Sequence, residues 1–267
     1  MFRSVIIGQY YPVESPVHAL DPRTKILITF AFIVVLFVAN NPAMYAVLAG
    51  FTLCSVALSK VPPRLIIRGL RPILFILVFT LTLHLFMTQG EELFRIGPLV
   101  ASKEGVVQGV YIAVRLILLL FTTSLLTLTT SPISLTDGLE SLMKPFSRVG
   151  VPAHELAMMM TIALRFIPTL MEEAERVMKA QMARGADFES GHILQRAKSL
   201  VPLLVPLFVS AFRRADDLAM AMEARCYRGG ENRTRMKQLH AGQRDVVAGA
   251  ATLLVVSLVV FMRWGVR

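Results

Sequence analysis

The sequence is poor in charge and in cysteine, and it has no acidic residue inside its long apolar runs. Only 17% of the residues are charged, whereas 55% are hydrophobic. Soluble domains average about 25% charged and about 45–50% apolar residues. A single core of this size cannot hide the apolar excess, so the composition predicts an integral membrane protein and excludes a disordered chain. Two cysteines, Cys54 and Cys226, are too few for a disulfide scaffold.

Several kinds of reactive site are also missing. No Gly-x-x-x-x-Gly-Lys-Ser/Thr loop occurs, so the chain is not expected to bind nucleotide as a P-loop ATPase. The five histidines are scattered, and no Ser/His/Asp or Cys/His arrangement stands out. We therefore predict no catalytic, cofactor or metal site, and hence no enzyme. The net charge of +10 could suit nucleic acid, but in a membrane protein Lys and Arg gather on cytoplasmic loops, so no nucleic-acid partner is expected.

Five apolar runs stand out along the chain. The pattern predicts an all-α integral membrane protein with about five transmembrane helices and a cytoplasmic region of long amphipathic helices. Because three of the runs are near the short end of what spans a bilayer, close packing or a thin bilayer region is needed to accommodate them. The runs cover approximately residues 26–39, 43–58, 72–87, 106–130 and 246–262.

The distribution of charge predicts four regions and their orientation. Residues 1–25 form a cytoplasmic N-terminal segment, 26–130 a four-helix membrane region, 131–243 a cytoplasmic region, and 244–267 a final transmembrane helix with a short external tail. Residues 131–243 hold more than half of all charged residues, and the 59–71 loop carries four basic residues and no acid. The positive-inside rule places both in the cytoplasm. Prolines in 131–243 are expected to break or kink its helices.

Three polar residues in helical patterns are best explained structurally. His84 is expected to be hydrogen-bonded near the outer end of its helix, although a polar residue in a span always raises a functional hypothesis. Arg115 is expected to extend toward the outer interface, with a substrate or lipid contact as the alternative. Arg165 is predicted to form a structural salt bridge with a carboxylate such as that of Glu172, Glu173 or Asp216.

The most informative pattern is an internal echo. Residues 174–185 align with residues 215–226 at a constant offset of 41. Each copy is a strong helix former that ends in Ala-Arg-small, namely Ala183-Arg184-Gly185 and Ala224-Arg225-Cys226, and glycine follows nearby. Because glycine commonly terminates helices, each arginine is predicted to lie at the tip of its own helix.

One explanation is electrostatic: the positive charge of an arginine near a helix C-terminus interacts favourably with the helix dipole, by about 0.3–1 kcal/mol. Two copies in register favour a second explanation. Methionine suits adaptable binding surfaces, and arginine forms bidentate hydrogen bonds with carboxylates. Such a pair of helix ends fits two similar grooves on a two-fold or pseudo-two-fold partner.

Several motifs together resemble one family, the transmembrane T component of energy-coupling factor transporters, which are bacterial ABC-type importers of vitamins and metal ions. The likeness covers essentially the whole chain. The second motif has Cys226 where glycine is common in that family. The resembling segments are Gly8-Gln9-Tyr10-Tyr11-Pro12, Ser15-Pro16-Val17-His18, Leu20-Asp21-Pro22-Arg23-Thr24-Lys25, Leu164-Arg165-Phe166-Ile167-Pro168, Ala183-Arg184-Gly185 and 223–230.

The resemblance implies a mechanical role. In that family two coupling helices end in an X-Arg-X motif, and each docks in a groove of one of two cytoplasmic ABC ATPase subunits, which form a homo- or heterodimer. An apolar surface holds a membrane-embedded substrate-binding S subunit, and several S subunits can be interchangeable. The expectation is therefore a multi-pass subunit of the bacterial cell membrane. It needs no cofactor, and ATP is hydrolysed in the partner subunits. The alternatives are a T component dedicated to one cobalt, nickel or biotin system, and an integral membrane enzyme acting on lipid.

Overall fold

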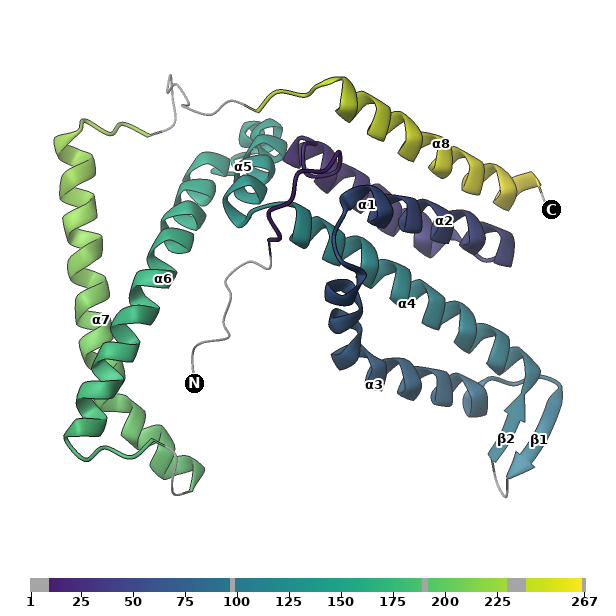
Figure 1. The fold of residues 1–267 in the computed structure, drawn as a ribbon, viewed down its shortest axis with the longest axis horizontal. Helices are drawn as coiled ribbons and strands as arrows, with labels where there is room; N and C mark the ends of the chain where they lie inside the picture. The colour runs from purple at the N-terminus through teal and green to yellow at the C-terminus, as the bar shows by residue number, and fades with distance from the viewer. Residues whose placement is uncertain (1–9, 97–98, 189–191, 230–238, 266–267) are drawn as a thin grey trace. The chain divides into compact units, whose positions relative to one another are not determined.

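The structure, a computed structural model, describes residues 10–96, 99–188, 192–229 and 239–265. They form an almost entirely helical chain, as predicted (Figure 1). The helices divide between two compact units. The apolar unit comprises Gly8–Leu139 and Gln238–Arg267, and the charged unit contains Glu140–Lys237. Each unit is described by itself below.

The apolar unit contains a helix for each of the five predicted apolar runs. Among the described residues, four helices are long and apolar enough to cross a membrane: α2 (Pro42–Ser59), α3 (Pro63–Met87), α4 (Lys103–Thr129) and α8 (Gln243–Gly265). The fifth, α1 (Pro22–Val38), has 17 residues. Proline occupies the first position of α1, α2 and α3, where its missing N–H has no helical partner to lose. The all-α membrane fold is thus confirmed.

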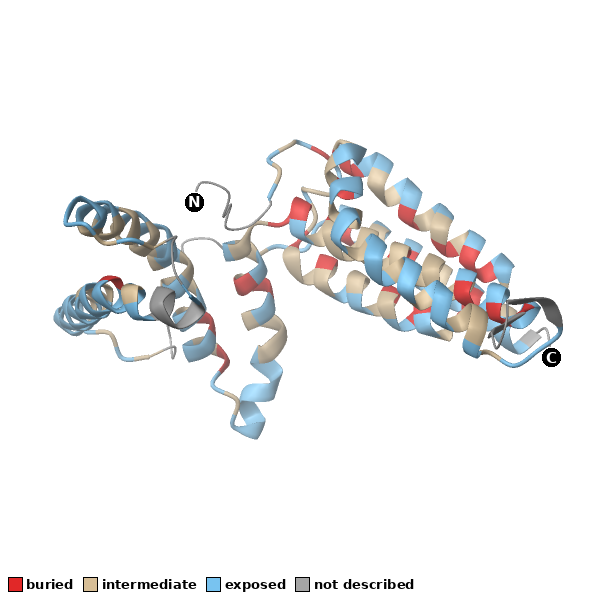
Figure 2. Ribbon diagram, turned by 90° about the horizontal axis from the view of Figure 1, so that it is seen from below, coloured by how far each residue is buried: buried red, intermediate tan, exposed pale blue. Residues whose placement is uncertain are grey.

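The core of this unit lies between α1, α2, α4 and α8, and α8 packs against α1 although it is the last element of the chain. Burial is confined to inward-facing positions, and the outer faces are exposed (Figure 2). Large apolar side chains such as Phe75, Phe261 and Trp264 are more than 70% exposed. Exposed apolar area on this scale is typical of a surface that meets lipid or protein rather than water. The buried centre is made by Phe32, Val35, Leu36, Met44, Leu48, Leu118 and Val259.

A buried polar network joins α1 to the start of α8. The Asp245 carboxylate accepts hydrogen bonds from the backbone N–H of Asp21 at 2.7 Å and of Gly242 at 2.8 Å. The ammonium of Lys25 is buried and donates to the carbonyl oxygens of His18 at 3.1 Å and Thr129 at 2.9 Å. The start of α1, the end of α4 and the start of α8 are therefore fastened together at one point.

The N-terminal segment is fastened to the same place through His18. Its Nε2 lies 2.9 Å from the carbonyl of Tyr11, and its Nδ1 lies 2.7 Å from the Ser15 hydroxyl. A carbonyl can only accept, so Nε2 carries the hydrogen and Nδ1 accepts from Ser15. Burial lowers the pKa of His18, in opposition to the Tyr11 carbonyl and with a smaller contribution from the Lys25 charge. The lowered pKa favours the neutral imidazole, and in that form Nδ1 accepts from the Ser15 hydroxyl.

Arg115, on α4, reaches the turn between α1 and α2. Its guanidinium donates to the Tyr45 hydroxyl at 2.9 Å and to the Ala39 carbonyl at 3.2 Å, and it lies 5.3 Å from the centre of the Phe37 ring. The carbonyl at the end of α1 has no helical partner of its own, so it is available as an acceptor. Arg115 therefore links α4 to the turn between α1 and α2.

The beginning of α3 differs from the sequence prediction. Most of the predicted 59–71 loop is helical, because α3 begins at Pro63 rather than near Pro72. A short antiparallel hairpin of β1 (Glu92–Ile96) and β2 (Leu99–Ser102) connects α3 to α4. At Gly105 an added Cβ would lie 2.4 Å from the His84 carbonyl oxygen, so glycine permits the close approach of the two helices. The His84 ring makes no hydrogen bond within the described part of the chain, contrary to expectation.

The charged unit is built on two long helices. The end of α5 (Pro132–Met143) and the 3₁₀ helix η1 (Lys144–Val149) lead into α6 (Ala153–Ala183), and α7 is Ile193–Ala224. With 31 and 32 residues, α6 and α7 are each about 45–50 Å long.

Prolines do not break these helices, although breaks or kinks were predicted: Pro168 lies inside α6, and Pro202 and Pro206 lie inside α7. Pro206 has no N–H, so the carbonyl of Pro202, four residues earlier, loses its helical donor. This carbonyl accepts instead from Gln181 Nε2 of α6 at 3.5 Å. A contact with the neighbouring helix thus compensates for the missing bond.

Candidate functional site

The two arginine motifs occupy the same structural position on their helices. Ala183 is the last residue of α6 and Ala224 the last of α7, so that Arg184 and Arg225 are the C-cap residues. Their backbone angles are nearly equal, with φ −87° and ψ 5° at Arg184 and φ −92° and ψ 13° at Arg225. Both side chains are exposed. The structure confirms that each arginine lies at the end of its own helix, as predicted.

The hydrogen bonds that end the two helices also match. After α6, the N–H of Gly185 donates to the Met182 carbonyl and that of Ala186 to the Gln181 carbonyl, both at 3.0 Å. After α7, the N–H of Cys226 donates to the Glu223 carbonyl at 2.8 Å and that of Tyr227 to the Met222 carbonyl at 3.0 Å. This double closure is the Schellman motif. The offset of 41 in the sequence is therefore an equivalence in structure.

The two motifs differ in the residue that adopts the left-handed conformation. Gly185 has a φ of +89°, whereas Cys226 has a φ of 55° and is not a glycine. The second helix therefore does not end on Gly229 or Gly230, the nearby glycines that the sequence suggested. An L-residue in this conformation costs roughly 1–2 kcal/mol, so the motif of α7 holds a small amount of backbone strain.

Replacing Cys226→Gly is expected to stabilise the end of α7 by about 1 kcal/mol or less. Glycine removes the left-handed cost but has more chain entropy to lose on folding, so the gain is partial. Gly185→Cys is the matched control and is expected to destabilise the end of α6, since nothing lies within 4 Å of its added Cβ and only the backbone responds. Thermal melting of the purified chain measures both. Shifts of the same sign for the two variants would contradict this account.

Arg165 lies on α6 and is exposed, and the ion pairs of the described residues do not include it. Two of its three proposed partners pair elsewhere: Glu172 with Arg176 at 3.7 Å and Glu173 with Arg214 at 2.7 Å. The second pair joins α6 to α7. The sequence analysis did not predict this pair, although Glu173 and Arg214 also lie 41 residues apart and each directly precedes one copy of the echo.

Both motifs place an exposed cation at the end of a helix. No group of three or more His, Cys, Asp or Glu side chains that could hold a metal ion occurs among the described residues. Each exposed guanidinium stands at the end of a helix, where its planar fork is available to a carboxylate. The site therefore consists of two similar cationic tips: Ala183, Arg184 and Gly185 on α6, and Ala224, Arg225 and Cys226 on α7.

Comparison with known proteins gives a consistent result. Residues 13–236 match the model of a family described as CbiQ, cobalt transport protein. A relative from Thermosediminibacter oceani is 64% identical over 253 residues, covering 95% of this chain and 96% of its own. Relatives from Acidaminococcus fermentans (54% identical, covering 100% and 99%) and Bacillus subtilis (50%, covering 98% and 100%) span nearly their whole lengths. All three are named energy-coupling factor transporter transmembrane protein EcfT.

Proposed function

The chain belongs to the CbiQ family of transport proteins, as a transmembrane component of energy-coupling factor transporters, and from this membership we propose that it couples two cytoplasmic ATPase subunits to a membrane-embedded S subunit that binds the solute. ATP closes the ATPase dimer, the tips of α6 and α7 move with it, and the S subunit is reoriented for uptake of a vitamin or related micronutrient. The chain itself neither hydrolyses ATP nor holds the solute.

The observation that carries the proposal is the pair of equivalent helix ends. Two helices with the same C-cap geometry present the same residue, Arg184 or Arg225, to solvent. A dimeric or pseudo-dimeric partner offers two similar grooves, and a carboxylate in each groove would accept the guanidinium bidentately. Two similar helix ends therefore fit two similar grooves of one dimeric partner.

The proposal is tested by purifying the tagged chain in mild detergent and identifying the subunits that co-elute, with and without charge reversal of both arginines. ATPase subunits bound to the wild-type chain, and lost from the variant, would support it. The co-eluting S subunits would identify the solute, and a single S subunit would favour a component dedicated to one solute.

We further propose that the chain lies in the bacterial cell membrane with its N-terminus and its charged unit on the cytoplasmic side, because basic residues are concentrated there. The test introduces single cysteines at Lys103 or Ser147 in a Cys54→Ser, Cys226→Ser background and probes them with a membrane-impermeant thiol reagent. Both positions are exposed. On intact cells the reagent is expected to label Lys103→Cys only. Labelling of Ser147→Cys alone would mean the reverse topology.

A further inference from the structure

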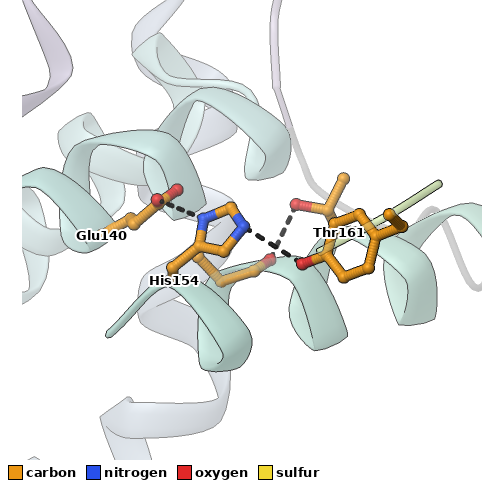
Figure 3. Close-up of polar contacts among 5 residues, drawn as sticks. Glu140, His154 and Thr161 are labelled. Carbon is orange, nitrogen blue, oxygen red and sulfur yellow. Dashed lines mark hydrogen bonds and ion pairs between the residues drawn. The ribbon is translucent and has the colours of Figure 1, made fainter. Parts of the chain in front are cut away.

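The second arginine motif is connected to the beginning of α6 by a short chain of side chains. His154, in the first turn of α6, lies with Nδ1 3.0 Å from the Glu140 carboxylate and with Nε2 3.3 Å from the Tyr227 hydroxyl. Figure 3 shows the His154 imidazole beside the Glu140 carboxylate. Glu140 is near the end of α5, and Tyr227 follows Cys226 directly. The three side chains thus connect α5, α6 and the end of α7 within the charged unit.

The direction of these hydrogen bonds follows from the chemistry of the groups. A carboxylate only accepts, so His154 Nδ1 carries the hydrogen and donates to Glu140. In the neutral imidazole Nε2 is then an acceptor, and the Tyr227 hydroxyl donates to it. Glu140 thereby fixes both the orientation and the tautomer of His154, and a correctly oriented His154 gives Tyr227 a fixed acceptor. The side chains of His154 and Glu140 are only 26% and 12% exposed, which shields the contact from water.

Tyr227 also belongs to the helix end. Its backbone N–H closes the Schellman motif of α7 on the Met222 carbonyl at 3.0 Å, two residues after Arg225. One residue therefore combines a backbone contact to the helix with a side-chain contact to His154. Its counterpart after α6 is Ala186, whose methyl side chain forms no hydrogen bond. The two tips share a cap but not this anchor.

We propose that His154 is a positioning residue for the second arginine motif: through Tyr227, and oriented by Glu140, it holds Arg225 in a fixed direction, while Arg184 has no equivalent brace from Ala186. The inference rests on the proposed function, since it concerns how the two tips meet the ATPase subunits. Under this proposal the two arginine motifs meet their ATPase subunits in different ways. The α7 tip is presented preorganised, whereas the α6 tip is ordered further upon docking.

The first test measures the free chain. A nitroxide on native Cys226, in a Cys54→Ser background, reports the local motion of the α7 tip by electron paramagnetic resonance. Tyr227→Phe removes a single oxygen, and both it and His154→Ala are expected to increase nitroxide mobility at Cys226. Tyr10→Phe is the matched control and is expected to change nothing, as is a label at Met182→Cys in the last turn of α6. Unchanged mobility at Cys226 in both variants would overturn the inference.

The second test measures ATPase binding, where a merely structural role would give a different pattern. Tyr227→Phe is expected to weaken binding about threefold to tenfold, the effect of one hydrogen bond. The loss is expected on an Arg184→Ala background and not on an Arg225→Ala background, because the anchor acts through Arg225. Equal losses on both backgrounds would contradict positioning. If neither arginine affected ATPase binding, the proposed function itself would fail, and the mobility test would still judge the anchor.

Discussion

Reversing the charge of both arginines, Arg184→Glu with Arg225→Glu, is expected to release the ATPase subunits and abolish solute uptake. Removing one partner of a buried, hydrogen-bonded charge pair at an interface costs about 2–5 kcal/mol. Because about 1.4 kcal/mol corresponds to a tenfold change, each lost pair weakens binding by about 30-fold to several-thousand-fold. A glutamate adds repulsion from the carboxylate in the groove. Each single variant is expected to impair transport, and the double variant to eliminate it.

The competing explanation, a helix-dipole contact, predicts an effect below about 1 kcal/mol and an intact complex. The two magnitudes are far enough apart for co-purification and uptake assays to separate them. Lysine at each position keeps the charge but loses the planar fork, so it is expected to fall between wild type and glutamate. Arg176→Glu is the matched control, because Arg176 is an exposed arginine on α6 outside the motif. A double variant that kept its ATPases and transported normally would end the coupling-helix interpretation.

Asp245→Ala is expected to be the most destabilising single change in the apolar unit. The alanine leaves the backbone N–H groups of Asp21 and Gly242 without their acceptor, and it removes a negative charge near the buried ammonium of Lys25. Leaving a buried donor without its acceptor costs about 1–3 kcal/mol, and two donors are affected here. Since Asp245 secures the start of α8 to α1, the last helix is expected to detach first. Thermal melting of the purified chain measures the loss.

Asp245→Asn is the informative companion variant, because it keeps one oxygen acceptor and removes the charge. It is expected to melt between the wild type and Asp245→Ala. Glu14→Ala, at an exposed acidic position of the same unit, is expected to leave the melting temperature unchanged. If Asp245→Ala melted with the wild type, the network would have no measurable part in holding α8.

The membrane fold could be predicted from the sequence because apolar runs of helical length have few alternatives in a bilayer. The second apolar run, expected from approximately residue 43, agrees with α2, which begins at Pro42. The beginning of α3 was missed, since Arg64, Arg68 and Arg71 interrupt the apolar run while leaving helical periodicity intact. Helix breaks or kinks at Pro202 and Pro206 were predicted from local propensity alone, and α7 continues through both residues, with Gln181 of α6 in contact with the Pro202 carbonyl.

The arginine tips were predictable because a local pattern, a helix followed by a small residue, was repeated at a fixed offset. The left-handed residue that follows α7 was not predicted, because it is Cys226 where the first motif has a glycine. A sequence alone does not show which L-residue adopts a left-handed backbone. The hydrogen-bond acceptors of Arg115, Tyr45 and Ala39, could not be identified from the sequence, because they lie more than 60 residues away in the chain. The contact between His154 and Tyr227, 73 residues apart, leaves no trace in spacing at all.

The ion pair between Glu173 and Arg214 limits how alike the two copies of the echo can be. Each residue directly precedes one copy, at the same offset of 41, and their side chains meet at 2.7 Å. Identical copies would bring two carboxylates or two guanidiniums together there, and two like charges about 4 Å apart repel by about 4 kcal/mol near a protein surface. The two helices therefore cannot carry the same residue at this contact. Their closest resemblance lies instead at the helix ends that carry Arg184 and Arg225.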